Sequence, residues 1–192
     1  MFKITKISKK SIYIFSFILS SFILNPQIIL SQSNQFYLKE HLVVDLFTST
    51  EWMRCSVGQR WNGETCIGKI ISLNHEQMDE VLRIASDQLG SGWRLPTRKE
   101  LESLVCKDCK IPKIDSKIFP RTEPVPYWTG ERNKFAKKHY WSVNFYTGNT
   151  YGRFYPYQSL AVRLVRDLSL IHISEPTRPE RIADAVLCLK KK

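Results

Sequence analysis

The sequence predicts a mixed α+β domain. Two segments have helical periodicity with capping residues at their starts, and an alternating hairpin pattern and a closing strand follow them. Hydrophobic residues make up 43% of the 192-residue chain and aromatic residues 12%, which is enough for a packed core. Helices early and antiparallel strands later are typical of the α+β class. We therefore expect a single domain at residues 34–167, with two helices and an antiparallel β-hairpin sheet.

The first predicted helix covers residues 75–89. Its apolar residues recur at helical spacing and are Met78, Val81, Leu82, Ala85 and Leu89. Asn74 or Ser72 can cap its start, and Gly90 can follow its last residue. A second, shorter helix is expected after Pro96, because Thr97 and Glu100 have capping-box spacing. Leu101, Leu104 and Val105 are its predicted buried residues.

Strands are predicted on both sides of these helices. Residues 43–47 are strand-forming, and residues 48–50 have the composition of a turn. Apolar and polar residues alternate over 141–146, residues 147–149 form a turn, and Tyr151, Arg153 and Tyr155 alternate on the returning strand. Residues 161–165 are the expected closing strand.

The two ends of the chain differ from this central segment. Residues 1–33 hold four Lys, no acidic residue and a 13-residue apolar run at 12–24, which predicts a secretory signal peptide cleaved near Ser31 or Ser33. An uncleaved membrane anchor running to Leu30 is the alternative. Residues 168–192 have no clear period, and 169–179 resemble translated sequencing-adapter sequence, so we interpret 168–192 as a non-native or disordered tail. The predicted location is exported: periplasmic, extracellular or on the cell surface.

Four cysteines lie in the central segment and allow three pairings. We favour Cys55 with Cys66 and Cys106 with Cys109, because each pair is local and flanks a turn. Oxidised cysteines are expected in an exported protein. A metal site or a redox role for the C-x-x-C at 106–109 is the alternative, although no second pair has matching spacing.

The basic charge is concentrated in one stretch. The whole chain has a net charge of +11, but residues 107–138 alone hold nine basic and four acidic residues. The rest of 34–167 is balanced. A local excess of this kind attracts polyanions, and the densest part is Arg132, Lys134, Lys137 and Lys138, followed by Lys113 and Lys117. The tyrosines and arginine of the predicted hairpin (Tyr151, Arg153 and Tyr155) could form a stacking surface for a sugar ring. The alternatives are an ordinary solvated loop face for the basic stretch and solvent-facing sheet aromatics for the hairpin.

Several short motifs occur together in one order. They are Trp52 to Cys55, residues 57–59 and 66–68, the GWRLPT stretch at 92–97, residues 114–115 and 127–129, and the VRLVR stretch at 162–166. This ordered set resembles the Lcl C-terminal domain family, named for the C-terminal module of a bacterial collagen-like adhesin, over about residues 40–167. The resemblance implies a C-type-lectin-like fold, an exported bacterial protein and adhesion through sulfated glycosaminoglycans. The GWRLPT stretch is also similar to sulfatase-modifying-factor domains, which share the broader fold.

These observations leave three hypotheses for function. The first is a non-enzymatic binding module for polyanionic or carbohydrate ligands, such as a surface glycan. The second is an enzyme of the sulfatase-modifying-factor type that uses Cys106 or Cys109, and the third is a structural envelope domain. We expect no cofactor or metal, no nucleic-acid partner and no membrane contact after signal removal. Calcium ligation of the lectin type is not predicted, because the late strands contain no Trp-Asn-Asp triplet.

Overall fold

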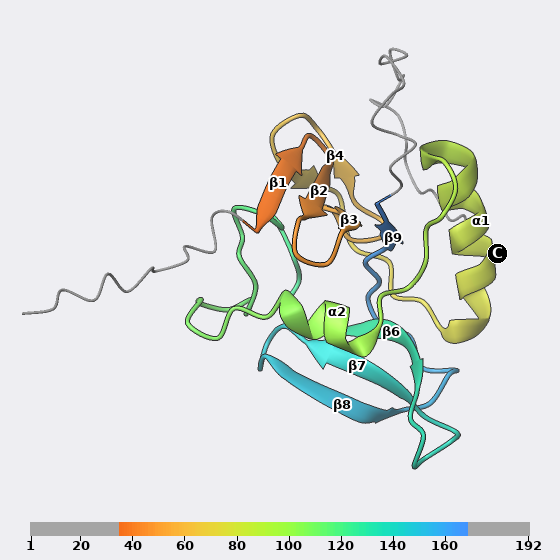
Figure 1. Cartoon of the computed structure of the whole chain (residues 1–192). Helices are drawn as coiled ribbons and strands as arrows, with labels where there is room; N and C mark the ends of the chain where they lie inside the picture. Colours follow the sequence, from red (N-terminus) through yellow and green to blue (C-terminus); the bar gives the residue numbers. More distant parts are fainter. Residues whose placement is uncertain (1–34, 169–192) are drawn as a thin grey trace, which may run out of the picture. The chain divides into compact units, whose positions relative to one another are not determined.

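Three antiparallel sheets and two α-helices make up the protein in the computed structural model, which describes residues 35–168 (Figure 1). The predicted signal peptide and almost all of the predicted tail lie outside these residues. The strands of the first half are β1 (Phe36–Lys39), β2 (Leu42–Asp45), β3 (Thr50–Met53), β4 (Arg60–Trp61) and β5 (Cys66–Ile67). The later strands are β6 (Pro126–Arg132), β7 (Tyr140–Asn144), β8 (Asn149–Phe154) and β9 (Val165–Asp167). The α+β class is therefore confirmed.

Both helical segments begin after a predicted capping residue, and the first ends at its predicted glycine. The second ends at Ser103, before the predicted Leu104 and Val105. A 3₁₀ turn at His75–Gln77 continues directly into α1 (Met78–Leu89), and the side chains of Asn74 and Gln77 form a reciprocal capping box. Gly90 follows α1 with a φ of 84°, a conformation that favours glycine. Helix α2 (Arg98–Ser103) begins at Thr97, whose hydroxyl accepts from the backbone N–H of Glu100.

The largest sheet joins the two ends of the described domain. Its strand order is β1-β2-β3-β9, so the last strand of the chain pairs with the third. The other sheets are the β4–β5 pair and the meander β6-β7-β8. Helix α2 lies along β7 on the side that faces the four-stranded sheet (Figure 1).

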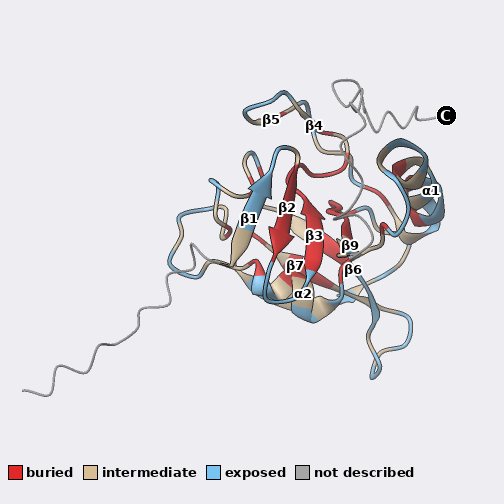
Figure 2. Cartoon of the chain, turned by 45° about the horizontal axis from the view of Figure 1, so that its top comes forward, coloured by how far each residue is buried: buried red, intermediate tan, exposed pale blue. Residues whose placement is uncertain are grey.

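Two hydrophobic clusters fill the spaces between these elements. The first joins α1 to the meander through Val81, Ala85 and Trp128. The second joins α2 to both larger sheets through Trp52, Leu101 and Tyr127. Strands β2 and β3 are buried along their whole length, whereas the outer side of α1 and the β6–β7 connection are exposed (Figure 2).

The closing strand differs from the prediction. A strand was expected at residues 161–165, but regular pairing starts only at Val165 and continues to Asp167. Before it, Val162 and Leu164 accept single backbone hydrogen bonds from Val57 and Met53. The reason is Arg163, whose buried side chain takes up the nearby backbone carbonyls that a regular ladder would need.

Both favoured disulfides are present. Cys55 pairs with Cys66 across the β4–β5 turn, with their Cα atoms 5.5 Å apart. Cys106 pairs with Cys109 just after α2, at a Cα distance of 5.3 Å. The cysteines thus close two local loops.

Candidate functional site

The last residue of β6 and the β6–β7 connection, residues 132–139, contain the densest basic group of the 107–138 stretch, and we call this segment the basic turn. Arg132, Lys134, Lys137 and Lys138 are all exposed within it. The turn projects beyond the meander at the lower right of Figure 1 and is largely pale blue in Figure 2. These four predicted site residues therefore share one protruding segment.

One asparagine organises the basic turn. The side-chain oxygen of Asn133 accepts from the backbone N–H of Phe135 at 2.9 Å and of Ala136 at 3.3 Å. Its amide nitrogen donates to the carbonyl of Gly152 on β8 at 2.8 Å. The backbone N–H of Asn133 donates to His139, and that of His139 donates to Ala136. The turn therefore has a defined conformation tied to the meander.

A series of aromatic rings lies beside the turn. The guanidinium of Arg132 lies 5.2 Å from the ring centre of Tyr140, and its Nε donates to the tyrosine hydroxyl at 2.7 Å. Tyr140 also stacks on His75, with the ring centres 3.6 Å apart. The ring centres of His139 and Tyr155 are 4.3 Å apart. Tyr155 stacks on Tyr157, with the ring centres 5.3 Å apart and an angle of 12° between the ring planes.

The charge of His75 is set by this environment. Burial of the ring lowers the pKa of His75 below its usual value, and the positive charge of Arg132 lowers it further. A backbone hydrogen bond with Thr129 opposes these effects. His75 is therefore neutral over a wider pH range than a free histidine.

The predicted tyrosine and arginine residues of the hairpin lie at two places. The guanidinium of Arg153 is 4.9 Å from the ring centre of Tyr151, and both belong to β8. The hydroxyl of Tyr151 is 3.3 Å from that of Thr147, and this hydrogen bond lowers the pKa of Tyr151. Tyr155 lies just past the end of β8, against His139 of the basic turn. Tyr155 is thus part of the ring series beside the turn.

Lys113 and Lys117 lie elsewhere. The backbone N–H of Lys113 donates to Phe145, just past the end of β7, whereas the basic turn precedes the start of that strand. The Nζ of Lys113 donates to the carbonyls of Lys107 and Cys109, so this ammonium stabilises the disulfide loop. Lys117 is exposed, and its carbonyl accepts from Arg54. The basic stretch is therefore divided between opposite ends of β7.

A depression of about 450 Å³ adjoins the residues that follow β8. Its apolar wall includes Pro126, Phe154 and Leu160, and its polar groups come from Ser72, Gln158 and Ser159. Gln158 also accepts from the backbone N–H of Tyr155 through its side-chain oxygen at 2.7 Å. This bond links the depression to the ring series.

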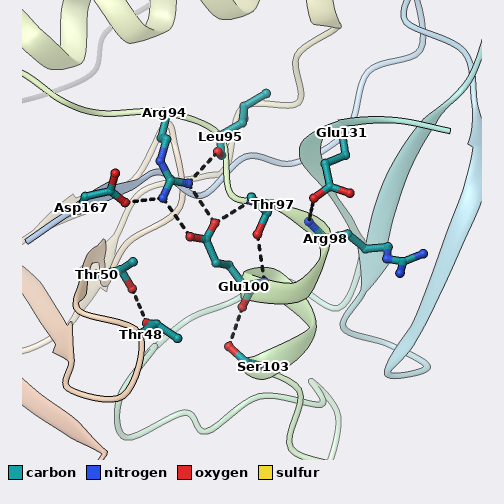
Figure 3. Close-up of polar contacts among 10 residues, drawn as sticks. All are labelled: Thr48, Thr50, Arg94, Leu95, Thr97, Arg98, Glu100, Ser103, Glu131 and Asp167. Atoms are coloured by element: carbon teal, nitrogen blue, oxygen red, sulfur yellow. Dashed lines mark hydrogen bonds and ion pairs between the residues drawn. The ribbon is translucent and has the colours of Figure 1, made fainter. Parts of the chain in front are cut away.

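The GWRLPT stretch has a structural role. Arg94 donates to both carboxylate oxygens of Glu100, at 2.9 and 2.8 Å, and also to Asp167 beyond it (Figure 3). Glu100 in turn accepts from the backbone N–H of Thr97. The stretch therefore fastens the start of α2 to the end of β9.

Arg163 of the VRLVR stretch is completely buried. It donates to the carbonyls of Met53 and Arg54 and to the hydroxyls of Ser56 and Thr122. All of these acceptors are neutral. Burial lowers the pKa of Arg163, because it disfavours the charged form.

The structure also bears on a reactive cysteine, a metal site and a membrane-spanning helix. Cys106 and Cys109 are joined to each other, so neither sulfur is a free thiol in this structure. Across residues 35–168 there is no group of three or more His, Cys, Asp or Glu side chains placed to hold a metal. No helix in this same part of the chain is long and apolar enough to cross a membrane.

Comparison with known proteins identifies the family. The sequence model of the Lcl C-terminal domain matches residues 41–166. The chain belongs to the Lcl C-terminal domain family. No curated protein sequence matches the chain. In this Lcl C-terminal domain, the matched residues run from just before β2 to the middle of β9.

Sequence reasoning missed several residues of the site in this Lcl C-terminal domain. His139 contacts the predicted Tyr155, Tyr140 contacts the predicted Arg132, and His75 stacks on Tyr140. His139 directly follows Lys138, and that adjacency is the only sequence signal for its position. His75 belongs to the turn before α1, and only the fold brings it to Tyr140.

Proposed function

We propose that this Lcl C-terminal domain is a non-enzymatic binding module for anionic polysaccharides such as sulfated glycosaminoglycans, and that it acts in adhesion. The observation that carries the proposal is the position of the basic turn beside the ring series. Four exposed cations and five aromatic or imidazole rings are close together there, from three parts of the chain.

The cations suit the fixed negative charges of such a polymer. Lysine and arginine make charge-assisted hydrogen bonds to sulfate and carboxylate oxygens. Arg132 is held against Tyr140 by the bond from its Nε, which leaves the outer nitrogens of the guanidinium for a ligand. Because the basic turn is tied to β8 through Asn133, less order has to be gained on binding.

The rings and the depression suit the sugar units. Tyr155 and Tyr157 are exposed by 38% and 67% and are nearly parallel, so they offer flat apolar faces. Ser72, Gln158 and Ser159 supply polar groups for sugar hydroxyls at the wall of the depression. This combination of charge and apolar ring faces supports a polysaccharide rather than a simple inorganic anion.

Retention on immobilised heparin tests the role of the turn. Replacing Arg132, Lys134, Lys137 and Lys138 by Ser should remove most of the retention, because the charge-assisted contacts are lost. Dissolved salt screens contacts between exposed charges. The unchanged domain should therefore need a higher salt concentration for elution than the variant with four Ser.

A charge-matched control separates the turn from the total charge. Replacing four other exposed lysines, Lys69, Lys99, Lys107 and Lys110, by Ser removes the same charge away from the turn. This control should keep most of its retention. Equal losses in both variants would show that only net charge matters, and retention by the turn variant would place the site elsewhere.

The C-type-lectin-like fold, the exported location and the adhesive role all belong to this proposal. The family match and the mixed α+β architecture support them. Mass spectrometry of the protein recovered from outside the cytoplasm should find an N-terminus near residues 32–34. An intact Met1 on that product would contradict cleavage of the signal peptide.

A further inference from the structure

We propose that the basic turn also docks on the surface of an anionic phospholipid bilayer, with Phe135 inserted at the boundary between headgroups and acyl chains. This inference goes beyond polysaccharide binding. It rests on Phe135, which the polysaccharide proposal does not use, together with the lysines that surround it.

Phe135 is unusual in its exposure. Its side chain is 99% exposed, more than any other large hydrophobic residue of the described chain. A phenyl ring gains free energy when it leaves water for an apolar medium. A single exposed hydrophobic residue is common on protein surfaces, so exposure alone does not identify a partner.

The second observation is that the structure holds Phe135 in this position. Its backbone N–H donates to the side-chain oxygen of Asn133, and the backbone N–H of Ala136 donates to the same oxygen. Asn133 is itself bonded to β8 through Gly152. The turn therefore presents the phenyl ring outward from a braced backbone, and little conformational freedom is lost when the ring inserts.

The charges around Phe135 suit anionic lipid. Lys134, Lys137 and Lys138 are within three residues of it, and Arg132 is at the base of the turn. Glu131 is the one acidic residue at 131–140, and its carboxylate accepts from the backbone N–H of Arg98. Lysine and arginine near an anionic membrane surface are attracted to it, and an apolar side chain beside them inserts at the interface.

The ring has no polar group with which to recognise a sugar. The stacked pair Tyr155 and Tyr157 offers hydroxyls beside its apolar faces, whereas Phe135 offers only a hydrocarbon surface. A lipid surface uses both features of the turn, the charge and the apolar tip. The sequence alone predicted no membrane contact after signal removal, since it shows neither the exposure of Phe135 nor its bracing.

Residues 34–168 are suitable for the test. Both hydrophobic clusters, both disulfides and all strand pairs of the described domain lie within 35–168. This segment also lacks the apolar run at 12–24 and the terminal lysines, which would bind membranes themselves. A cooperative unfolding transition for each variant confirms that it is folded.

The experiment measures co-sedimentation with vesicles. We expect binding to vesicles of phosphatidylcholine with about one-third phosphatidylglycerol, and far weaker binding to phosphatidylcholine alone. Phe135→Ser should lower the partition coefficient between water and vesicles roughly tenfold, because one aromatic side chain is no longer buried in the lipid. Phe135→Trp should bind, and its fluorescence should be quenched by brominated lipid more than that of the parent domain.

Three results with vesicles would each overturn the membrane proposal. They are no binding by the parent domain, equal binding by Phe135→Ser, or a Phe135→Trp signal that brominated lipid does not quench further. Heparin retention separates the two proposals, because Phe135→Ser should leave it unchanged. If Phe135→Ser weakens heparin retention as much as vesicle binding, Phe135 belongs to the polysaccharide site and the membrane proposal fails.

Discussion

At the scale of single residues, Arg163 has the most demanding position. A buried guanidinium is costly unless its N–H groups are satisfied. Here two carbonyls and two hydroxyls accept from its two terminal nitrogens, whereas its buried Nε has no hydrogen-bond partner. The rings of Phe119 and Tyr127 lie 4.9 and 5.8 Å from the guanidinium. Sequence analysis treats a charged residue in a strand as exposed, so the burial of Arg163 could not be predicted.

We predict that Arg163→Leu lowers the free energy of unfolding by about 3 kcal/mol, because four buried acceptors lose their donors. Arg163→Lys should also be destabilised, since one ammonium cannot reach all four. Chemical denaturation measures both.

The control for this prediction is Arg83→Leu on α1. Arg83 pairs with Glu80 and Asp87, but its side chain is 61% exposed, so the loss should be much smaller than that of Arg163→Leu. Equal losses in the two variants would show that the buried carbonyls find other donors.

At the scale of elements, Glu100 connects the start of α2 to the large sheet. Burial raises the pKa of Glu100, but hydrogen bonds from Arg94 and Thr97 outweigh this effect and lower it. A carboxyl whose pKa is lower in the folded state stabilises the fold above its unfolded pKa of about 4.3. That contribution is lost as the pH falls through the folded value.

We predict that Glu100→Gln lowers the free energy of unfolding by about 1–2 kcal/mol at neutral pH, because it removes the negative charge that pairs with Arg94 and one of the two accepting oxygens. The difference from the unchanged domain should shrink below about pH 4. Urea titrations between pH 3 and 7 measure it.

The matched substitution Glu64→Gln changes an exposed carboxylate in the β4–β5 turn and should have little effect at any pH. A Glu100→Gln difference that stays constant down to pH 3 would contradict the role of its charge.

The elements that were predicted correctly depend on local signals. The side chains of Asn74 and Thr97 satisfy neighbouring backbone groups and Gly90 takes a positive φ after α1, so a few residues determine these helix ends. Both disulfides also close short loops. The pairing of β3 with β9 and the contact of His75 with Tyr140 join distant segments, and no local pattern encodes them.

For the candidate site too, the sequence predicts the features that are local in the chain and not those that depend on the fold. The charge count identified the basic turn, because its four cations are close together in the sequence. It could not separate Lys113 from them, since only the fold shows that this ammonium is bonded to backbone carbonyls. Exposure of Phe135 likewise depends on the conformation of the turn.

At the scale of the whole molecule, the described domain contains its own cores and closing strand. The backbone N–H of Leu168 donates to Ser49, so the last residue that the structure describes still contacts the large sheet. We predict that removing residues 169–192 changes the free energy of unfolding by less than about 0.5 kcal/mol. Thermal unfolding of the two forms measures this, and a loss above about 2 kcal/mol would show that the tail packs on the domain.

The register of the large sheet also determines how the domain can be joined to other chains. Phe36, Asp45, Thr50 and Asp167 are consecutive partners in one row across the four strands. With neighbouring strands about 4.8 Å apart, the first and last strands have their outer ends about 14 Å from each other. Phe36 and Asp167 therefore lie at the same end of the strands in the large sheet. A host protein could carry this domain within a single surface loop, and a pull between the two flanking segments would open the sheet one strand pair at a time.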